Sequence, residues 1–209
     1  MHAVVWSDYI CPWAYLGRDR TALLRSLGVA VVSMPYELHP DIPPQGRAVR
    51  PDGRMARVYA AIADECAEAG MVLRPPSHVP NSGRALATAE VTRAHDPTRF
   101  DAMDAALFAA HFVEGRDIGD PDVLDDIVEG AGLPARDIRT LVDRGDGRQS
   151  VAASMTHAHD NGVAATPAWL FGADGDGLVL PGVQPRELYE RIVTRLRARE
   201  GDSPPGSER

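Results

Sequence analysis

The sequence predicts an α/β fold in which a large helical block separates the two halves of a small sheet domain. Strand, helix and strand patterns alternate within the first forty residues, whereas strand patterns return only near residue 168, before a final helix. The chain has 209 residues, of which 44% are hydrophobic and 25% are charged. This length and composition suffice for one large domain, or for a core domain with a sizeable insertion.

The first half of the sheet domain is predicted from the first forty residues. Residues 3–7 are apolar and β-prone. Residues 12–27 place apolar side chains at helical spacing before Gly28, a residue well suited to end a helix. Residues 29–38 are rich in Val and predict a second strand. A strand–helix–strand unit of this kind predicts two parallel strands.

A helical block and the second half of the sheet are predicted from the rest of the chain. Residues 54–146 follow a Pro- and Gly-rich loop and show helical spacing without a convincing strand. Residues 168–171 and 178–180 are apolar runs on either side of the turn-rich segment 172–177, and they predict a hairpin. Residues 185–197 predict an amphipathic closing helix.

This order of elements is that of a thioredoxin fold with a large all-helical insertion between its βαβ and ββα halves. We expect residues 1–40 and 147–199 to form the thioredoxin-like domain, and residues 54–146 to form the insertion. Residues 200–209 are polar and contain two adjacent prolines, so we expect a disordered tail there.

Charge, hydropathy and cysteine usage restrict the classes of function. The formal net charge is −8, which disfavours a nucleic-acid partner because phosphate backbones require a basic face. No apolar run approaches the ~20 residues that span a bilayer, and the N-terminal segment lacks the pattern of a signal peptide. We therefore expect a cytoplasmic protein with no membrane partner. Cys11 and Cys66 are too few for a disulfide framework, and a reducing compartment would keep both as thiols.

Cys11 lies between the first predicted strand and the first predicted helix. The first turn of a helix has unpaired N–H groups and a partial positive charge, which stabilise a thiolate and lower the pKa of the thiol. Pro12 fits the first helical position, because its missing N–H would have no partner there. This placement predicts a reactive nucleophile at Cys11. The alternative is a buried cysteine that only packs.

Thr166 and Pro167 immediately precede the first of the two late strands. Proline lacks the N–H that a central strand would use, and a cis peptide bond that turns the chain sharply is one reason for its presence. An ordinary trans proline at the start of a strand is the alternative.

Three other residues have two interpretations each. Asp8 is either a turn residue or a carboxylate that raises the pKa of Cys11 or moves its proton. Trp13 either lines a substrate surface or belongs to the core. Cys66 shares a predicted apolar helix face, which favours packing over a role as a distant resolving thiol. No set of His, Cys and carboxylate residues has the spacing of metal ligands, so no metal is expected.

Several segments resemble the DsbA family, and in particular its FrnE-like branch. The stretch Trp6–Gly17 looks like the active-site segment of that branch, in which Asp-x-x-Cys-Pro-Trp-Cys-Tyr-x-Gly is usual. The stretch Gly162–Pro167 is similar to the family's Gly-Val-x-Gly-Thr-Pro, whose proline is cis and lies against the catalytic cysteine. The stretch Gly182–Pro185 resembles the family's Gly-Ala-Gln-Pro, and the likeness extends to about Arg199.

The resemblance implies a role for each matching residue. Cys11 would be the catalytic nucleophile, within a motif completed by three residues, Pro12, Trp13 and Ala14. A second segment, Thr166 and Pro167, would form the cis-proline loop that contacts the substrate or a small thiol.

Ala14 stands where the family has its second cysteine. In a dithiol enzyme the second thiol resolves the mixed disulfide that the first one forms, and Ala14 cannot do so. A single thiol can still exchange with a small thiol such as glutathione or mycothiol. Two related groups, 2-hydroxychromene-2-carboxylate isomerases and kappa-class glutathione transferases, bind glutathione with Ser in the position of Cys11 and have no second cysteine.

The residues and the resemblance together predict a thiol-dependent oxidoreductase that exchanges through a mixed disulfide with a small thiol or a protein. Two alternatives stay open. One is a glutathione-type isomerase or transferase acting on an aromatic small molecule, and the other is a non-catalytic binding protein that kept the fold. No tightly bound cofactor is expected, glutathione or mycothiol would be a co-substrate, and a homodimer is left open.

Overall fold

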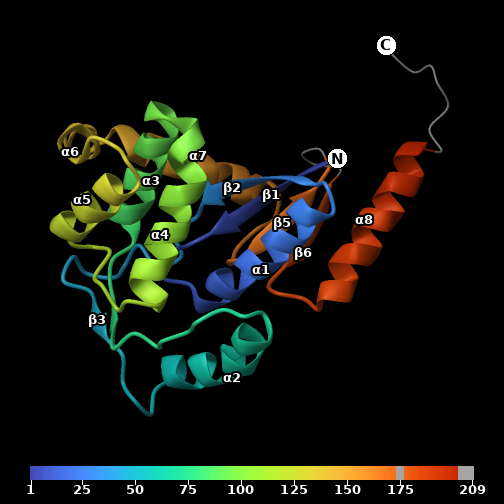
Figure 1. Cartoon of the computed structure of the whole chain (residues 1–209), viewed down its shortest axis with the longest axis horizontal. Coiled ribbons are helices and arrows are strands. Elements are labelled where there is room, and N and C mark those ends of the chain that lie inside the picture. The colour runs from blue at the N-terminus through green and yellow to red at the C-terminus, as the bar shows by residue number, and fades with distance from the viewer. Residues whose placement is uncertain (173–176, 202–209) are drawn as a thin grey trace.

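A computed structural model describes residues 1–172 and 177–201 of the chain, and it contains a four-stranded sheet with the order β2-β1-β5-β6 (Figure 1). β1 (His2–Ser7) and β2 (Ala30–Pro35) are parallel. β5 (Ala168–Phe171) is antiparallel to β1, and β6 (Leu178–Pro181) is antiparallel to β5. The predicted α/β fold with a βαβ half and a ββα half is therefore confirmed.

Helices connect the two halves of the sheet and cover both of its faces. They are α1 (Pro12–Ser26), α2 (Arg54–Glu68), α3 (Gly83–His95), α4 (Phe100–Phe112), α5 (Pro121–Gly130), α6 (Ala135–Arg144), α7 (Asp146–Asp160) and α8 (Arg186–Gly201). α1 connects β1 to β2, and α8 follows β6. Among the helices of the described residues, none is long and apolar enough to cross a membrane.

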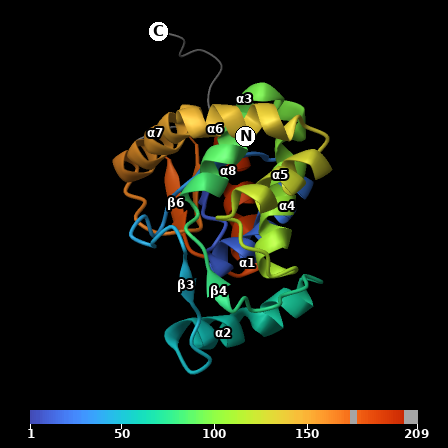
Figure 2. The same cartoon turned by 90° about the vertical axis from the view of Figure 1, so that its left-hand side faces the viewer.

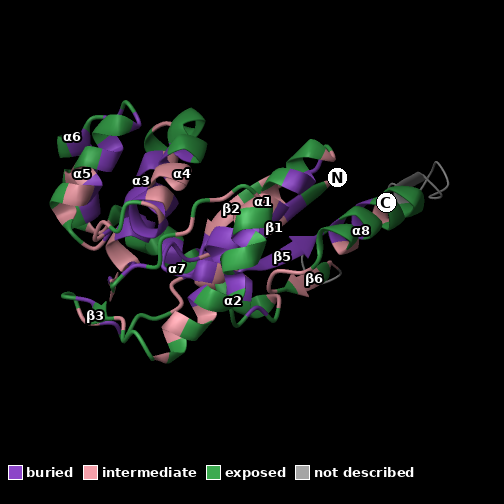
Figure 3. Cartoon of the chain, turned by 60° about the horizontal axis from the view of Figure 1, so that its bottom comes forward, coloured by how far each residue is buried: buried purple, intermediate pink, exposed green. Residues whose placement is uncertain are grey.

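The two central strands, β1 and β5, send alternate side chains to opposite helical layers. Val5 and Trp169 pack with side chains of α1 and α8 on one face. Trp6 and Leu170 pack with Ala158 of α7 on the other face. Figure 3 shows that buried residues gather on the strands and on the inward sides of the helices. A third and larger cluster joins the segment around Cys11 to the helices of the insertion.

Residues 54–146 are largely helical, and they contain one short element that the sequence analysis did not predict. β3 (Arg47–Ala48) pairs antiparallel with β4 (His78–Val79). The expectation that no strand falls in this segment is therefore wrong for β4, because two residues are too few to show the alternation of a strand. Figure 2 shows α2 and the β3–β4 pair together at the lower end of the molecule, below the bundle of α3 to α6.

Two late segments are only partly covered by the structure. The turn predicted at residues 172–177 includes residues 173–176, which lie outside the described residues. α8 reaches Gly201, so the first two residues of the tail expected at residues 200–209 are helical. Residues 202–209 lie outside the described part of the chain.

Candidate active site

The junction between β1 and α1 holds Cys11 at the N-cap of the helix, with extended backbone angles of φ −85° and ψ 114°. The backbone N–H of Cys11 donates to the carbonyl oxygen of Asp8 at 3.0 Å, and the N–H of Tyr15 donates to the carbonyl oxygen of Cys11 at 3.0 Å. Pro12 occupies the first turn, as the sequence predicts. The thiol is therefore held over the first turn of α1, where helical N–H groups have no partner within the helix.

The segment before β5 closes over the same thiol. The Thr166–Pro167 peptide bond is cis. The Sγ–H of Cys11 donates to the carbonyl oxygen of Thr166 at 3.3 Å. The hydroxyl of Thr166 is buried and has no hydrogen-bond partner among the described residues. The structure thus brings together Cys11 and the Thr-Pro segment, which the sequence places 155 residues apart.

Gly17 lets α1 approach this segment closely. A Cβ at position 17 would lie 3.1 Å from the Cη2 atom of Trp169 and 3.2 Å from the Cγ atom of Pro167. Both distances are shorter than ordinary van der Waals contact. A glycine at this place in α1 therefore allows the helix, the proline and the central strand to meet behind Cys11.

Burial governs the ionisation of Cys11. The residue is 3% exposed. Burial raises the pKa of its thiol to about 11, although the Thr166 side chain and the backbone N–H groups of Ala14 and Trp13 act in the opposite direction. The expected fall of this pKa is therefore wrong for the closed structure. The helix start favours the thiolate, but the loss of its hydration costs more.

Asp8 combines the two roles that the sequence left open. Its side chain is fully buried and accepts hydrogen bonds from the N–H of Leu38 at 2.7 Å, from the Ser82 hydroxyl at 3.1 Å and from the N–H of Ile10 at 3.2 Å. It therefore ties the active-site loop to the end of β2 and to the start of α3. Burial raises the pKa of Asp8 to about 6, and the charge of Asp8 in turn raises the pKa of Cys11.

Cys66 lies on α2 and is fully buried in the same large cluster as Cys11. Both cysteines are free thiols. Tyr59, whose pKa is raised by burial and further by a charged Cys11, precedes Cys66 by seven residues, which is about 10 Å along a helix. Cys66 itself acts on the pKa of Tyr15. The full burial of Cys66 agrees with its packing interpretation.

Tyr59 is a neighbour of Cys11 that the sequence analysis treated only as part of an apolar helix face. It is 2% exposed, and its hydroxyl has no hydrogen-bond partner among the described residues. A tyrosine on an otherwise apolar face was the available signal. Trp13, by contrast, is half-buried and packs against the large cluster. In the described part of the chain, no group of three or more His, Cys, Asp or Glu residues is arranged to hold a metal ion.

A cavity of about 140 Å³ lies beside this motif, between α1, the sheet and α4. Ala14 and Pro167 form part of its wall. Ala14 is 2% exposed. The cavity is therefore lined by one residue of the motif that begins at Cys11 and by the proline that follows Thr166.

Comparison with known proteins agrees with this geometry. A family model described as the DSBA-like thioredoxin domain matches residues 3–193. The crystal structure of the probable DsbA oxidoreductase SCO1869 from Streptomyces coelicolor is similar, with a TM-score of 0.82 and 23% identity. The similarity covers 100% of this chain and 94% of that chain.

Two other solved structures share the fold. A 2-hydroxychromene-2-carboxylate isomerase has a TM-score of 0.77 and 15% identity, covering 97% of this chain and 98% of that chain. The cytosolic disulfide reductase DsbM from Pseudomonas aeruginosa, solved with GSH, has a TM-score of 0.67 and 21% identity, covering 94% of this chain and 100% of that chain. The predicted relation to DsbA-like proteins and to this isomerase is therefore confirmed at the level of fold.

Proposed function

Because this chain belongs to the family of DsbA-like thioredoxin domains, we propose that it is a thiol-dependent oxidoreductase that works with one active-site cysteine, Cys11. The observation that supports this most directly is the meeting of Cys11, the carbonyl group of Thr166 and the methyl group of Ala14 at the start of α1. In this proposal Cys11 is the nucleophile, the Thr166–Pro167 segment faces the substrate, and no second thiol stands at position 14.

The proposed reaction is an exchange through a mixed disulfide. The sulfur of Cys11 attacks one sulfur of a disulfide, a new S–S bond forms, and the other sulfur leaves as a thiolate. The proton lost by Cys11 balances the proton that the leaving thiolate takes up. A second small thiol then attacks the mixed disulfide and releases Cys11 as a thiol. Because Ala14 supplies no resolving sulfur, this second step depends on a thiol from solution or from the substrate.

The raised pKa makes the resting protein a slow nucleophile. With a pKa of about 11, about one Cys11 in ten thousand is a thiolate at pH 7. Exchange with a bound disulfide therefore requires that the substrate stabilise the developing charge or displace part of the surrounding packing. We assign proton exchange near the thiol to Asp8, a buried carboxyl group whose pKa is about 6 and whose charge acts on Cys11.

Glutathione or mycothiol is the small thiol that we propose as co-substrate, in a cytoplasmic setting and without a tightly bound cofactor. The described fold of DsbM, a cytosolic disulfide reductase solved with GSH, supports this assignment by likeness of fold. The two buried free thiols of this chain suit a reducing compartment.

Two other functions have a specific observation in their favour. A glutathione-type isomerase or transferase needs no resolving cysteine, and the fold is similar to that of 2-hydroxychromene-2-carboxylate isomerase. A non-catalytic binding protein would tolerate a thiol as buried as Cys11.

Intact mass spectrometry after incubation with oxidised glutathione tests the proposal. We expect one glutathionyl group on the native protein, located at Cys11, and none on the Cys11→Ser variant. Reduced glutathione should then remove the adduct. A native chain that stays unmodified at Cys11, while the chain unfolded in denaturant is modified at both cysteines, would favour the binding protein.

A further inference from the structure

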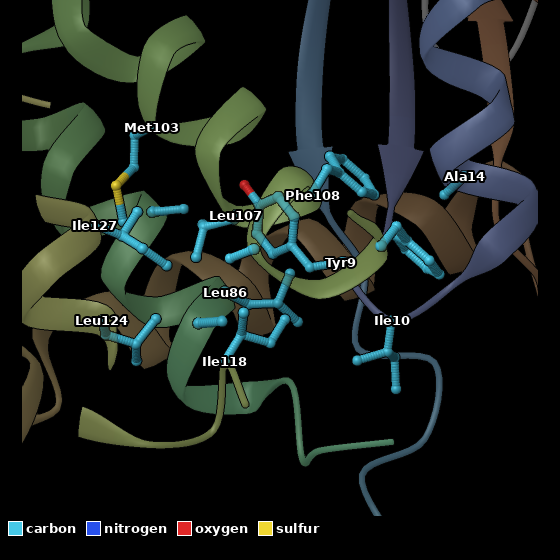
Figure 4. Close-up of a cluster of buried hydrophobic side chains, with 14 of the residues drawn as sticks. Tyr9, Ile10, Ala14, Leu86, Met103, Leu107, Phe108, Ile118, Leu124 and Ile127 are labelled. Atoms are coloured by element: carbon cyan, nitrogen blue, oxygen red, sulfur yellow. The ribbon is translucent and has the colours of Figure 1, made fainter. Parts of the chain in front are cut away.

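The cavity beside Ala14 and Pro167 is lined partly by these two residues and partly by polar side chains. Its lining includes three hydroxyl-bearing residues, Ser7, Thr21 and Ser33. Figure 4 places Ala14 in a cluster of buried side chains with Tyr9 and Phe108. Cys11 does not itself line this cavity, but Ala14 of its motif and Pro167 of the segment that contacts its thiol do, so the cavity lies next to the proposed site of reaction.

Arg18 is the charged residue of this cavity closest in sequence to the motif. It follows Ala14 by four residues on α1, so the two side chains lie on the same face of the helix. Its guanidinium lies over the ring of Phe108, with 5.5 Å between the Cζ atom and the ring centre. Within the described residues, Arg18 makes no hydrogen bond or ion pair, so its N–H donors are available to a ligand.

The other charged groups that line the cavity already have partners. Arg25 pairs with Asp101 at 3.1 Å, and both of these side chains are exposed at the rim. Asp104 accepts a hydrogen bond from the Tyr9 hydroxyl at 3.1 Å. Burial raises the pKa of Asp104, although Arg18 acts against this rise. Of the four charged residues, Arg18 is thus the one with no hydrogen bond or ion pair among the described residues, although the charge of Asp104 attracts it.

We propose that this cavity binds the carboxylate of an anionic low-molecular-weight disulfide or thiol, and that Arg18 selects it while the sulfur of the same molecule reacts at Cys11. The inference rests on the proposed thiol exchange and adds a substrate class to it. A guanidinium is planar and presents paired N–H donors that match a carboxylate. Stacking on Phe108 limits the side-chain entropy that Arg18 loses when it binds an anion.

Three symmetrical disulfides of similar length and different charge test the proposal. They are 3,3′-dithiodipropionate, which is anionic, 2-hydroxyethyl disulfide, which is neutral, and cystamine, which is cationic. The rate of mixed-disulfide formation at Cys11 is followed by intact mass in a Cys66→Ala background. Each rate is divided by the rate of the same disulfide with a small model thiol. We expect the anionic compound to react roughly tenfold faster than the neutral one, and the cationic compound to be slowest.

Variants of the two arginines assign the preference to one residue. Arg18→Gln should make the three normalised rates equal. Arg18→Lys should keep part of the preference for the anionic compound, and this retained preference would show that the site still folds. Arg25→Gln, at the rim, should leave the preference in place. Raising the ionic strength should reduce the preference of the wild-type protein.

Two results would overturn the inference while the proposed exchange stands. One is equal normalised rates in the wild-type protein. The other is a preference for cystamine, which would mean that Asp104 selects the ligand rather than Arg18. A Cys11 that reacts with none of the three compounds in the folded protein would overturn both the inference and the proposed exchange.

Discussion

The Sγ atom of Cys11 lies 3.3 Å from the carbonyl oxygen of Thr166 and donates a hydrogen bond to it. A carbonyl oxygen accepts only from the protonated thiol, so this contact favours the thiol form. The hydroxyl of the same threonine acts the other way, because it lowers the pKa of Cys11. The hydroxyl has no hydrogen-bond partner among the described residues, so Thr166 favours the thiol through its backbone and leaves a donor free for the thiolate.

Replacement of Thr166 by Val should make Cys11 a weaker nucleophile. The variant keeps the shape of the side chain and removes the hydroxyl that favours the thiolate, so the pKa of Cys11 should rise further. We expect alkylation by iodoacetamide to slow by roughly tenfold at a fixed pH below the pKa. Thr166→Ser, which keeps a hydroxyl, is the matched control. An unchanged rate in Thr166→Val would show that the hydroxyl does not reach the thiolate.

Alkylation of the native protein should report the high pKa of Cys11 directly. In a Cys66→Ala background, the rate should keep rising with pH up to about 11. At pH 8 it should be about a hundredfold below that of a cysteine in an unstructured peptide, because so little thiolate is present. A rate that levels off near pH 7 would mean that the helix start outweighs burial.

Asp8 should make the stability of the protein fall as the pH rises. Its pKa is raised from 3.8 to about 6 in the folded state, so the folded protein holds this proton more tightly than the unfolded chain. The stabilisation is fully present below pH 3.8 and is lost as the pH rises through about 6. Relative to Asp8→Asn, the free energy of unfolding of the wild-type protein should fall by about 2 kcal/mol between pH 4 and pH 7.

Denaturant unfolding of both proteins at several pH values measures this difference. The asparagine variant serves as the reference because it cannot ionise, and other titrating groups are common to the two proteins. A difference that stays constant over this range would contradict the raised pKa of Asp8.

Ala14→Cys should add the dithiol chemistry that the wild-type protein lacks. The cavity beside Ala14 leaves room for the larger side chain, and an introduced thiol three residues after Cys11 gives the mixed disulfide a fast intramolecular exit. We expect the variant to oxidise the thiols of a reduced substrate protein, and the wild-type protein to be poor in the same assay.

Cys11→Ser and Cys66→Ala complete this experiment. The first should abolish activity in either background. The second should have no effect, because Cys66 is fully buried on α2. If the wild-type protein matches Ala14→Cys and loses its activity in Cys66→Ala, then Cys66 acts as a distant resolving thiol.

Gly17→Ala should destabilise the fold around the active site. The added methyl group would meet Trp169 and Pro167 at 3.1 and 3.2 Å, and neither ring is free to turn away. We expect a loss of about 1–3 kcal/mol in the free energy of unfolding, as for overpacked cores. Gly130→Ala is the matched control, because nothing lies within 4 Å of its added Cβ. The control should be neutral or slightly stabilised.

The sequence predicted the order of the main elements because hydrophobic periodicity extends over whole helices and strands. The helix starting at Pro12 and the strands from residues 168 and 178 lie where their patterns indicate. The strand β4 was missed because two residues carry no period. Hydrophobic periodicity therefore predicts only elements that are long enough to repeat the period.

The chemistry of the site was predicted less completely than the fold. The position of Cys11 at a helix start follows from its neighbours in the chain, but its burial depends on α2 and on the Thr166 segment, which are distant in sequence. The same holds for Arg18, which meets Phe108 only after α4 has packed against α1. Local reasoning therefore predicted the position of Cys11 at the helix start, whereas its prediction of a lowered thiol pKa was wrong because burial raises that pKa.

Because both thiols are buried, the rates at which they are labelled can measure local opening of the protein. Cys11 lies at the N-cap of α1 and Cys66 on α2, and both belong to one large core cluster. A reagent too bulky to enter the closed core can label either thiol only during transient openings, so each labelling rate measures the free energy of one opening. Equal rates at the two positions would mark a single cooperative unit. Faster labelling at Cys66 would show that α2 separates from the core before the sheet does.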